Sequence, residues 1–415
     1  MEKIIVVHPG KQHSYRLAEA LKKNGMLQYY VTTVYDKKNS WTHILGKYLK
    51  GDNKKRFLTR KNEVFDNDVV QFCELPGLFL LLLYRKMPKS KFTKWFENHI
   101  HKVVYQKTIK FAGKNKPDAI IFYDGLSEKH FRLKEKYCPN TKFIIDVPSA
   151  TDEYMRKILE EDIAVTGDEY TRIEQSETWH IKDSAIPARN RLADGFLVGS
   201  SFVRKSLTNF NTDERKIKIV PYGVDTSRFV CKHFTMNSGK IRFIFVGRVN
   251  RRKGIQHLLP AFDKIESNKA ELVLVGPYDE NDELVKKYAT HSNIFFKGFV
   301  TSDVVADYYM RSDIFVLPSL GEGLAQVGIE AMNCGLPIIV SDNSGVNDLV
   351  TEGREGFVVP TSDMNALYEK MQWFVENPSK VKEMGVNAYA TAKKYTWNFY
   401  ETNVVRAIKE ILSNQ

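Results

Sequence analysis

The sequence has few cysteines, and their spacing argues against a covalent or metal framework. Only four occur in 415 residues, and no two of them form a Cys-x-x-Cys pair. Zinc sites and small disulfide-bonded domains both need cysteines at short, repeated spacings. We therefore expect neither a disulfide framework nor a structural zinc site.

Long apolar runs are also missing. The longest, residues 78–84, is far shorter than the roughly 20 residues that a membrane-spanning helix needs. Met1, Glu2 and Lys3 lead directly into a strand-like run at residues 4–7, without a signal-peptide cleavage pattern. We therefore expect a cytoplasmic location.

The turn after this first strand lacks the Gly-x-Gly-x-x-Gly pattern, which argues against a dinucleotide-binding dehydrogenase. A glycine-bearing turn between the strand and the helical pattern at residues 14–24 still predicts a βαβ unit. Gly10, Lys11 and His13 would then lie at the carboxyl end of the strand, where open α/β sheets bind ligands. For His13, an ordinary surface loop is the alternative.

The length and composition are those of a folded chain with two domains. A hydrophobic content of 43% suffices for full cores. Strand-like runs alternate with helical patterns along most of the chain, which predicts an α/β fold with two doubly wound, Rossmann-like parallel sheets.

Positive charge is concentrated in the first part of the chain. Residues 1–150 contain 29 Lys and Arg against 14 Asp and Glu, whereas residues 229–415 contain 21 against 22. Anionic phospholipid, a lipid-linked phosphate or nucleic acid could each bind such a basic half.

Residues 41–116 combine this charge with aromatic and apolar side chains. Lysines and arginines flank the apolar run at residues 78–83, and Phe92, Trp95 and Phe96 are interleaved with further lysines. This composition favours contact with an anionic membrane surface. A buried helix with a solvated basic neighbour is the alternative.

Two aspartates follow predicted strands of the N-terminal half. Asp124 comes after the strand at residues 119–122, and Asp146 after the strand at residues 142–145. Because parallel strands end at one edge of a sheet, both are candidates for a cleft there. Either could instead cap the helix that follows.

Residues 316–342 predict a strand, a glycine-bearing loop, a short helix and a second strand. Glu322 lies in the loop and Glu330 within the helix at residues 327–334. The unpaired N–H groups at a helix N-terminus can bind phosphate, and carboxylates beside it can accept hydroxyl groups. Exposed, solvated glutamates are the alternative.

Two cations follow the first strand of the predicted second domain, at residues 241–246. Arg248 and Lys253 would lie at its carboxyl end, where they could neutralise a diphosphate. We expect Arg251 and Arg252, in the same run of charge, to be exposed.

Several short fragments occur in one order along the chain. They are Val220-Pro221-Tyr222-Gly223-Val224-Asp225, Val246-Gly247-Arg248, Lys253-Gly254, Leu274-Val275-Gly276, Lys297-Gly298, Leu317-Pro318-Ser319, and the segment from Glu322 to Glu330. Together they resemble the retaining glycosyltransferases of the GT-B fold, family 4, also described as glycosyl transferases group 1. The resemblance is close in the C-terminal half and covers only the general βα layout before it.

The resemblance implies a nucleotide-sugar donor bound by the C-terminal domain and a glycan or lipid-linked acceptor bound by the N-terminal one. Arg248 and Lys253 would stabilise the departing diphosphate, so no metal or other cofactor is expected. Glu330 would bind the ribose and Glu322 the donor sugar. The other implied donor-binding residues are Gly247, Phe299, Val300, Gly323, Ala325, Gln326 and Val327.

The chain also departs from the family pattern. The family often has Glu-Gly-Phe-Gly-Leu where this chain has Glu-Gly-Leu-Ala-Gln at residues 322–326, which would place a polar Gln326 beside the donor sugar. No characteristic histidine is obvious at a strand end of the N-terminal half. We therefore take Asp146 as the catalytic candidate there, with Gly10, Lys11, His13 and Asp124 for the acceptor.

The predicted organisation is an acceptor-binding domain (residues 1–228), a linker (229–240), a donor-binding domain (241–394) and a terminal helix (395–415) that packs back on the first domain. A retaining transferase for a lipid-linked or cell-envelope glycan, peripheral at the inner face of the membrane, is the leading hypothesis. A sugar-nucleotide epimerase of the same fold, or a nucleic-acid-binding protein using the basic half, are the alternatives; the leading hypothesis involves no nucleic acid.

Overall fold

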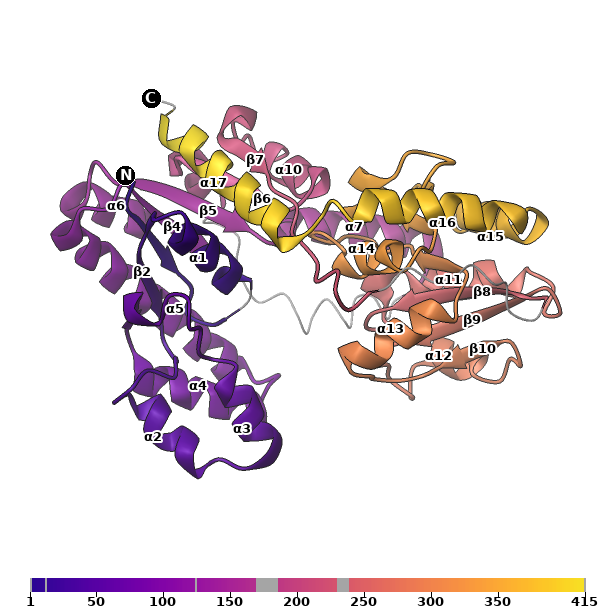
Figure 1. Ribbon diagram of the computed structural model, residues 1–415, viewed down its shortest axis with the longest axis horizontal. Helices are drawn as coiled ribbons and strands as arrows, with labels where there is room; N and C mark the ends of the chain where they lie inside the picture. The colour runs from indigo at the N-terminus through magenta and orange to yellow at the C-terminus, as the bar shows by residue number, and fades with distance from the viewer. Residues whose placement is uncertain (1, 12, 124, 169–185, 230–238, 414–415) are drawn as a thin grey trace.

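Two parallel β-sheets, one in each half of the chain, form the frame of the molecule (Figure 1). The computed structural model describes residues 2–11, 13–123, 125–168, 186–229 and 239–413. Asp124, assigned above to the acceptor, lies outside these residues, as does most of the predicted linker. The predicted domain boundaries therefore stay predictions.

The first sheet has seven strands in the order β3-β2-β1-β4-β5-β6-β7. Its strands are β1 (Ile4–Val7), β2 (Leu27–Thr32), β3 (Val69–Gln71), β4 (Ala119–Tyr123), β5 (Lys142–Val147), β6 (Gly195–Val198) and β7 (Ile217–Ile219). All neighbours pair in parallel. The strand order reverses between β1 and β4, the kind of position at which open α/β sheets bind ligands.

The second sheet has six parallel strands in the order β10-β9-β8-β11-β12-β13. They are β8 (Ile241–Val246), β9 (Ala270–Val275), β10 (Ile294–Phe296), β11 (Ile314–Leu317), β12 (Ile338–Ser341) and β13 (Gly356–Val359). Here the order reverses between β8 and β11. The predicted class of two doubly wound sheets is thus confirmed.

Helices cover both sheets, because the strands are apolar on both faces and must be buried on both. Those of the first half are α1 (Ser14–Lys23), α2 (Trp41–Tyr48), α3 (Gly51–Leu58), α4 (Glu74–Lys86), α5 (Lys91–Asn115), α6 (Glu128–Tyr137), α7 (Asp152–Thr166), α9 (Ile186–Leu192) and α10 (Ser201–Thr208). Those of the second are α11 (Ile255–Asp263), α12 (Glu283–Tyr288), α13 (Ser302–Met310), α14 (Gln326–Asn333), α15 (Met364–Glu376), α16 (Ser379–Ala392) and α17 (Trp397–Ser413).

Helix α17 returns to the first sheet, as the sequence predicts (Figure 1). The Lys23 ammonium pairs with Glu401 at 2.7 Å, and the Lys142 ammonium donates to the carbonyl of Ile411 at 2.9 Å. The apolar face of the helix, including the fully buried Ile408, joins the core beside α1. The last segment of the chain thus fastens the two halves together.

Helix α7 makes a second connection between the halves. Its Asp162 is fully buried and accepts hydrogen bonds from His257 at 2.5 Å, Gln256 at 2.8 Å and Ser362 at 2.5 Å, all in the second half. Burial alone would raise the pKa of Asp162, but the hydrogen bonds from His257 and Ser362 outweigh it and hold the pKa below its usual value.

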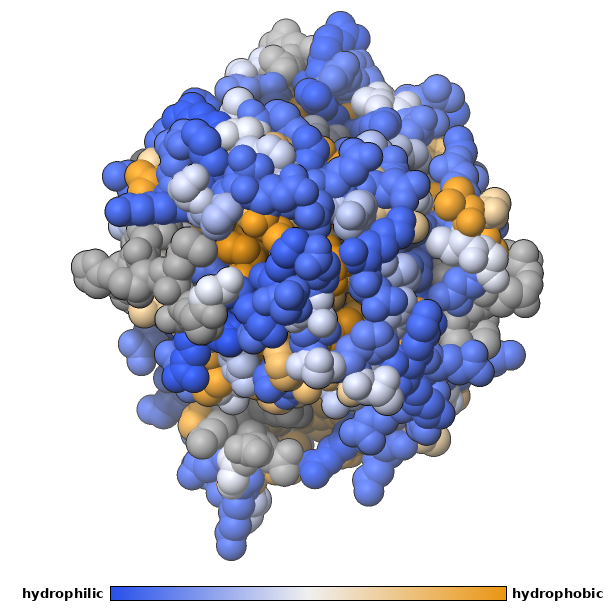
Figure 2. Space-filling view, turned by 90° about the vertical axis from the view of Figure 1, so that its right-hand side faces the viewer, coloured by the Kyte–Doolittle hydropathy of each residue, from blue (hydrophilic) through white to orange (hydrophobic). Residues whose placement is uncertain are grey.

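The face of the second half that lies at the right of Figure 1 is mostly hydrophilic, with small separate apolar areas (Figure 2). No helix within the described part of the chain is long and apolar enough to cross a membrane.

The packing of α17 predicts a stability effect. Ile408→Ala should lower the free energy of unfolding by roughly 2–5 kcal/mol, because it leaves a cavity between α17 and the first sheet. Urea unfolding of the two proteins would measure this. Arg406→Ala, on the exposed face of the same helix, should change it by less than about 0.5 kcal/mol. Equal losses in both variants would contradict the packing described.

Candidate functional site

The loop after β8 and the loop after β11 meet through charge. The Lys253 ammonium pairs with Glu322 Oε1 at 2.7 Å, and Arg252 Nη1 lies 3.0 Å from the same oxygen. Lys253 crosses the backbone at Gly247, where a built β-carbon would lie 3.6 Å from its Cε. The structure therefore brings together Lys253 and Glu322, two of the residues assigned above to the donor.

Arg248 and Arg252, both in the loop after β8, differ in their contacts. Arg248 is exposed and forms no ion pair within the described residues. Arg252 is also exposed, as expected, yet it donates to the carbonyl of Gly321 at 2.9 Å as well as to Glu322. Two cations thus converge on the Glu322 carboxylate.

The expectation that Arg251 is exposed was wrong. Its side chain is only 3% exposed, with Nε 2.5 Å from Asp168 and Nη1 2.7 Å from Asp282. Both carboxylates come from distant parts of the sequence, so a run of charge could not reveal them. Buried charge is tolerated here because it is paired and hydrogen-bonded. Asp168 follows α7, so this contact also joins the two halves.

Glu330 lies on α14 in a partly buried position. Burial raises the pKa of its carboxyl to about 7, although a hydrogen bond with Tyr309 and the charge of Arg228 act to lower it. Tyr309 is fully buried and also donates to the carbonyl of Val327 at 3.1 Å. The environment thus keeps Glu330 near the boundary between its neutral and ionised forms at physiological pH.

The glycine-bearing loop is pressed against the first half of the chain. A β-carbon built on Gly323 would lie 1.7 Å from the carbonyl oxygen of Pro148, so only glycine fits there. Ser200 Oγ donates to the carbonyl of Gly323 at 2.5 Å. Pro148 is two residues beyond Asp146, and Gly323 follows Glu322. This contact therefore brings the two predicted site regions to the same interface.

The remaining donor candidates are placed as follows. Ala325 is buried and precedes the first turn of α14, where Gln326 and Val327 begin the helix. The side-chain amide of Gln326 donates to the carbonyl of Gly223 at 3.0 Å. Gly223 lies in the segment after β7, and the sequence did not indicate this contact. Phe299 is 77% exposed, and Val300 packs against the core.

A second cluster lies at the carboxyl ends of β1 and β5. His13 Nε2 is 3.2 Å from both carboxylate oxygens of Asp146, and the Tyr222 hydroxyl lies 3.5 Å from one of them. Asp146 is buried, whereas His13 is half-buried. The His13 ring packs on Tyr222 and Tyr123. The pairing of His13 with Asp146 could not be derived from the sequence, because 132 residues separate them.

The turn before His13 is also constrained. The amide of Gly10 donates to His8 Nδ1 at 2.8 Å. The Lys11 ammonium donates to the carbonyl of Thr59 at 2.5 Å, and burial together with the nearby Arg60 lowers the pKa of Lys11. Lys11 and His13 therefore lie at one edge of the first sheet, where Thr59 holds the Lys11 ammonium and Asp146 holds the His13 ring.

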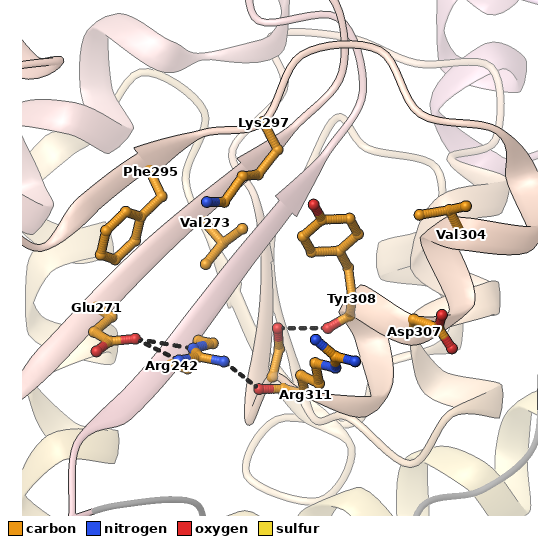
Figure 3. Close-up of a pocket in the computed structure, with 10 residues that line it drawn as sticks. Arg242, Glu271, Val273, Phe295, Lys297, Val304, Asp307, Tyr308 and Arg311 are labelled. Carbon is orange, nitrogen blue, oxygen red and sulfur yellow. Dashed lines mark hydrogen bonds and ion pairs between the residues drawn. The ribbon is translucent and has the colours of Figure 1, made fainter.

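A separate pocket of about 410 Å³ lies between α13 and strands β8–β10 (Figure 3). Its lining residues include Tyr308, Lys297 and an ion pair between Arg242 and Glu271. None of the predicted site residues lines it. Within the described ranges, no group of three or more His, Cys, Asp or Glu side chains is placed to hold a metal ion.

Comparison with known proteins gives matches to a family model, to curated relatives and to solved structures. Residues 231–391 match the family model for glycosyl transferases group 1. The chain is 27% identical over 243 residues to a sulfoquinovosyl transferase, SQD2, of Arabidopsis thaliana, which covers 55% of this chain and 47% of that protein. It is 25% identical over 213 residues to the capsular polysaccharide biosynthesis glycosyltransferase CapM of Staphylococcus aureus, covering 47% of this chain and 55% of that protein.

The chain thus spans about half the length of these curated relatives. The crystal structure of Anabaena HepE in complex with UDP is similar over 99% of this chain and 100% of that one, with a TM-score of 0.63 and 14% identity. This likeness identifies the fold as GT-B, with two Rossmann-like domains.

The raised pKa of Glu330 predicts a pH-dependent stability. The folded chain holds this proton up to about pH 7, whereas the ordinary value is 4.5, so the free energy of unfolding should fall as pH rises between these values. In the Glu330→Gln variant, the fall in the free energy of unfolding over this pH range should be smaller by roughly 1–3 kcal/mol. Unfolding at a series of pH values measures the difference. Identical slopes for the two proteins would contradict the burial assigned to Glu330, and Glu376→Gln, also on a C-terminal helix, serves as the control.

Proposed function

We propose that the protein is a glycosyltransferase, which moves a sugar from a nucleoside-diphosphate sugar to a hydroxyl group of an acceptor. The observation that carries this proposal is the convergence of Lys253 and Glu322 at the strand-order reversal of the second sheet. A cation for a diphosphate and a carboxylate for sugar hydroxyls lie there side by side, next to the N-terminus of α14.

Each donor residue has a role suited to its chemistry. Lys253 and the exposed Arg248 bind the diphosphate and stabilise the negative charge that develops as it leaves. N–H groups in the first turn of α14, at Gln326 and Val327, bind a phosphate oxygen. Glu330 accepts the ribose hydroxyls, Glu322 those of the sugar, and Phe299 with Val300 borders the base. The match of residues 231–391 to the group 1 family supports this assignment.

The proposed reaction retains the configuration at the anomeric carbon. The bond from this carbon to the diphosphate oxygen breaks, and a bond to the acceptor oxygen forms on the same face. The acceptor proton passes to the departing phosphate oxygen. The protein groups hold the two reactants in this geometry and need no covalent intermediate or metal. The anomeric configuration of the product, read by NMR, tests retention directly.

The acceptor side is formed by Gly10, Lys11, His13 and Asp146. Asp146 orients the His13 ring, which can then hydrogen-bond an acceptor hydroxyl. We propose a lipid-linked or cell-envelope glycan as the acceptor, for an enzyme that works at the inner face of the cell membrane. The basic N-terminal half supports this choice, as does the similarity to a transferase of capsular polysaccharide biosynthesis.

The donor site predicts a matched pair of binding results. In a thermal-shift screen of UDP, GDP, ADP and dTDP sugars, at least one should raise the melting temperature of the wild-type protein. Lys253→Ala should abolish that rise and reduce transfer about 100-fold or more, because the leaving group loses its cation. Lys382→Ala, an exposed lysine on α16, should alter neither. A protein that binds such a donor but never hydrolyses or transfers its sugar would refute the proposed activity.

The pairing of His13 with Asp146 predicts that breaking it slows the reaction with the acceptor but leaves donor binding unchanged. Asp146→Asn should leave the donor-induced thermal shift unchanged but lower kcat/KM for the acceptor by about 100-fold, because the histidine loses the partner that orients it. Steady-state kinetics with each substrate varied in turn separates the two effects. A weaker donor shift with unchanged acceptor kinetics would contradict the assignment. Asp118→Asn, at an exposed turn before β4, is the control.

A further inference from the structure

Three helices of the N-terminal half present apolar stripes to solvent. On α2, Trp41, Ile44, Leu45 and Tyr48 follow helical spacing and are all exposed, Trp41 to 55% and Tyr48 to 80%. On α4 the exposed stripe is Leu75, Phe79 and Leu82, and at the start of α5 it is Phe92 and Trp95. Stripes of this kind normally face a core, so here they need another partner.

The stripes are joined into one face. Phe79 of α4 packs on Phe96 of α5 at 5.3 Å between ring centroids, and Phe96 is stacked on Phe92 at 6.0 Å. Thr42 of α2 donates its backbone N–H and its hydroxyl to Glu74 of α4, both at 2.7 Å. These bonds hold the first turn of α2 against the first turn of α4. Figure 1 shows α2, α3 and α4 together, away from the second sheet.

This docking face, formed by the stripes of α2, α4 and the start of α5, is bordered by positive charge. Exposed lysines without an ion pair among the described residues lie on or beside these helices; they are Lys47, Lys50, Lys54, Lys86 and Lys91. Protein interfaces are depleted in lysine, whereas an anionic bilayer attracts it. Tryptophan and tyrosine prefer the boundary between headgroups and acyl chains. The combination selects a lipid surface over a protein partner.

We infer that the docking face binds an anionic phospholipid bilayer, with Trp41, Trp95 and their apolar neighbours entering the headgroup region and the lysines contacting lipid phosphates. The sequence leaves open whether residues 41–116 are buried or exposed. The structure contains both: α4 buries Leu78, Leu80 and Leu83 and exposes the opposite stripe.

The docking face is mechanically connected to the proposed acceptor site. On the inner side of α4, a β-carbon on Gly77 would lie 2.7 Å from the side chain of Thr33, so helix and loop are in close contact. The Thr33 hydroxyl donates to the carbonyl of Pro9 at 2.6 Å, in the turn that carries Gly10, Lys11 and His13. Docking would therefore hold this turn near the lipid surface. Only this last step rests on the proposed function, since it concerns how a lipid-linked acceptor reaches the site.

Flotation with vesicles tests the charge component. The wild-type protein should float with vesicles of phosphatidylcholine and phosphatidylglycerol at low salt, and much less with phosphatidylcholine alone or at high salt. Lys47→Glu with Lys86→Glu should weaken vesicle affinity by at least about tenfold. Lys286→Glu with Lys382→Glu, which makes the same charge change on the C-terminal half, should weaken it by less than about twofold. Equal losses in both pairs would overturn the assigned face.

Brominated phospholipids test the insertion component, because they quench tryptophans that enter the bilayer. Vesicle binding should quench part of the fluorescence of the wild-type protein. Trp41→Phe with Trp95→Phe should still float but lose that quenching, whereas Trp373→Phe with Trp397→Phe should keep it. Absence of quenching in the wild-type protein would overturn insertion. Concentration-dependent dimerisation that the Lys47→Glu, Lys86→Glu pair abolishes, without vesicle binding, would assign the face to a protein contact instead.

Sugar transfer to a soluble acceptor separates this inference from the proposed function. The docking variants should retain it, because their residues lie outside the proposed site. If the wild-type protein binds vesicles but transfers no sugar, the enzyme proposal fails and the docking face stands. If it transfers sugar but ignores anionic vesicles, the docking face is refuted.

Discussion

The carbonyl oxygen of Pro148 lies 1.7 Å from the point that a β-carbon on residue 323 would occupy, so the loops of the two halves can approach this closely only because that residue is Gly323. Ser200 completes the contact by donating to the Gly323 carbonyl. The contact fixes the loop after β11 against the loop after β5. Because Glu322 and Asp146 lie next to these points, the same steric constraint holds the two candidate site regions in register.

Buried charge adds a second set of constraints around this contact. Asp162 and Arg251 are almost completely buried, and each is compensated by partners from the other half or from distant loops. Removing one partner of such a pair would leave a charge in a medium of low dielectric constant, which costs several kcal/mol. The halves are thus joined by groups that tolerate little displacement. Arg251 also anchors the loop that carries Lys253, so the residues that follow α7 are tied to the candidate donor site.

The N-terminal half contains both the proposed acceptor site and the proposed docking face. Its sheet presents His13 and Asp146 at one edge, and its helices α2, α4 and α5 expose apolar and basic side chains at another. Thr33 connects the two through its contacts with Gly77 and Pro9. The proposed lipid-binding surface and the proposed site for a lipid-linked acceptor would act together only if they are rigidly coupled. Here a short chain of packed residues provides that coupling.

The sequence by itself determined the type of fold and predicted candidate residues for a donor site. Alternating apolar strands and amphipathic helices are local patterns, and they predicted two doubly wound sheets and a terminal helix that returns to the first. Strand ends followed by glycines and charged residues located Lys253, Glu322 and Glu330, because in parallel sheets such positions lie at one edge. Their roles stay predictions.

Only the tertiary structure decided which of these groups meet. Three pairs show this: His13 with Asp146, Lys253 with Glu322, and Arg251 with Asp168. Their partners come from separate parts of the sequence or from different halves. Their pairing depends on how whole elements pack, which no local spacing encodes. The same is true of exposure: the run at residues 78–83 is apolar throughout, and only packing against α5 and the loop after β2 determined which leucines were buried and which remained at the surface.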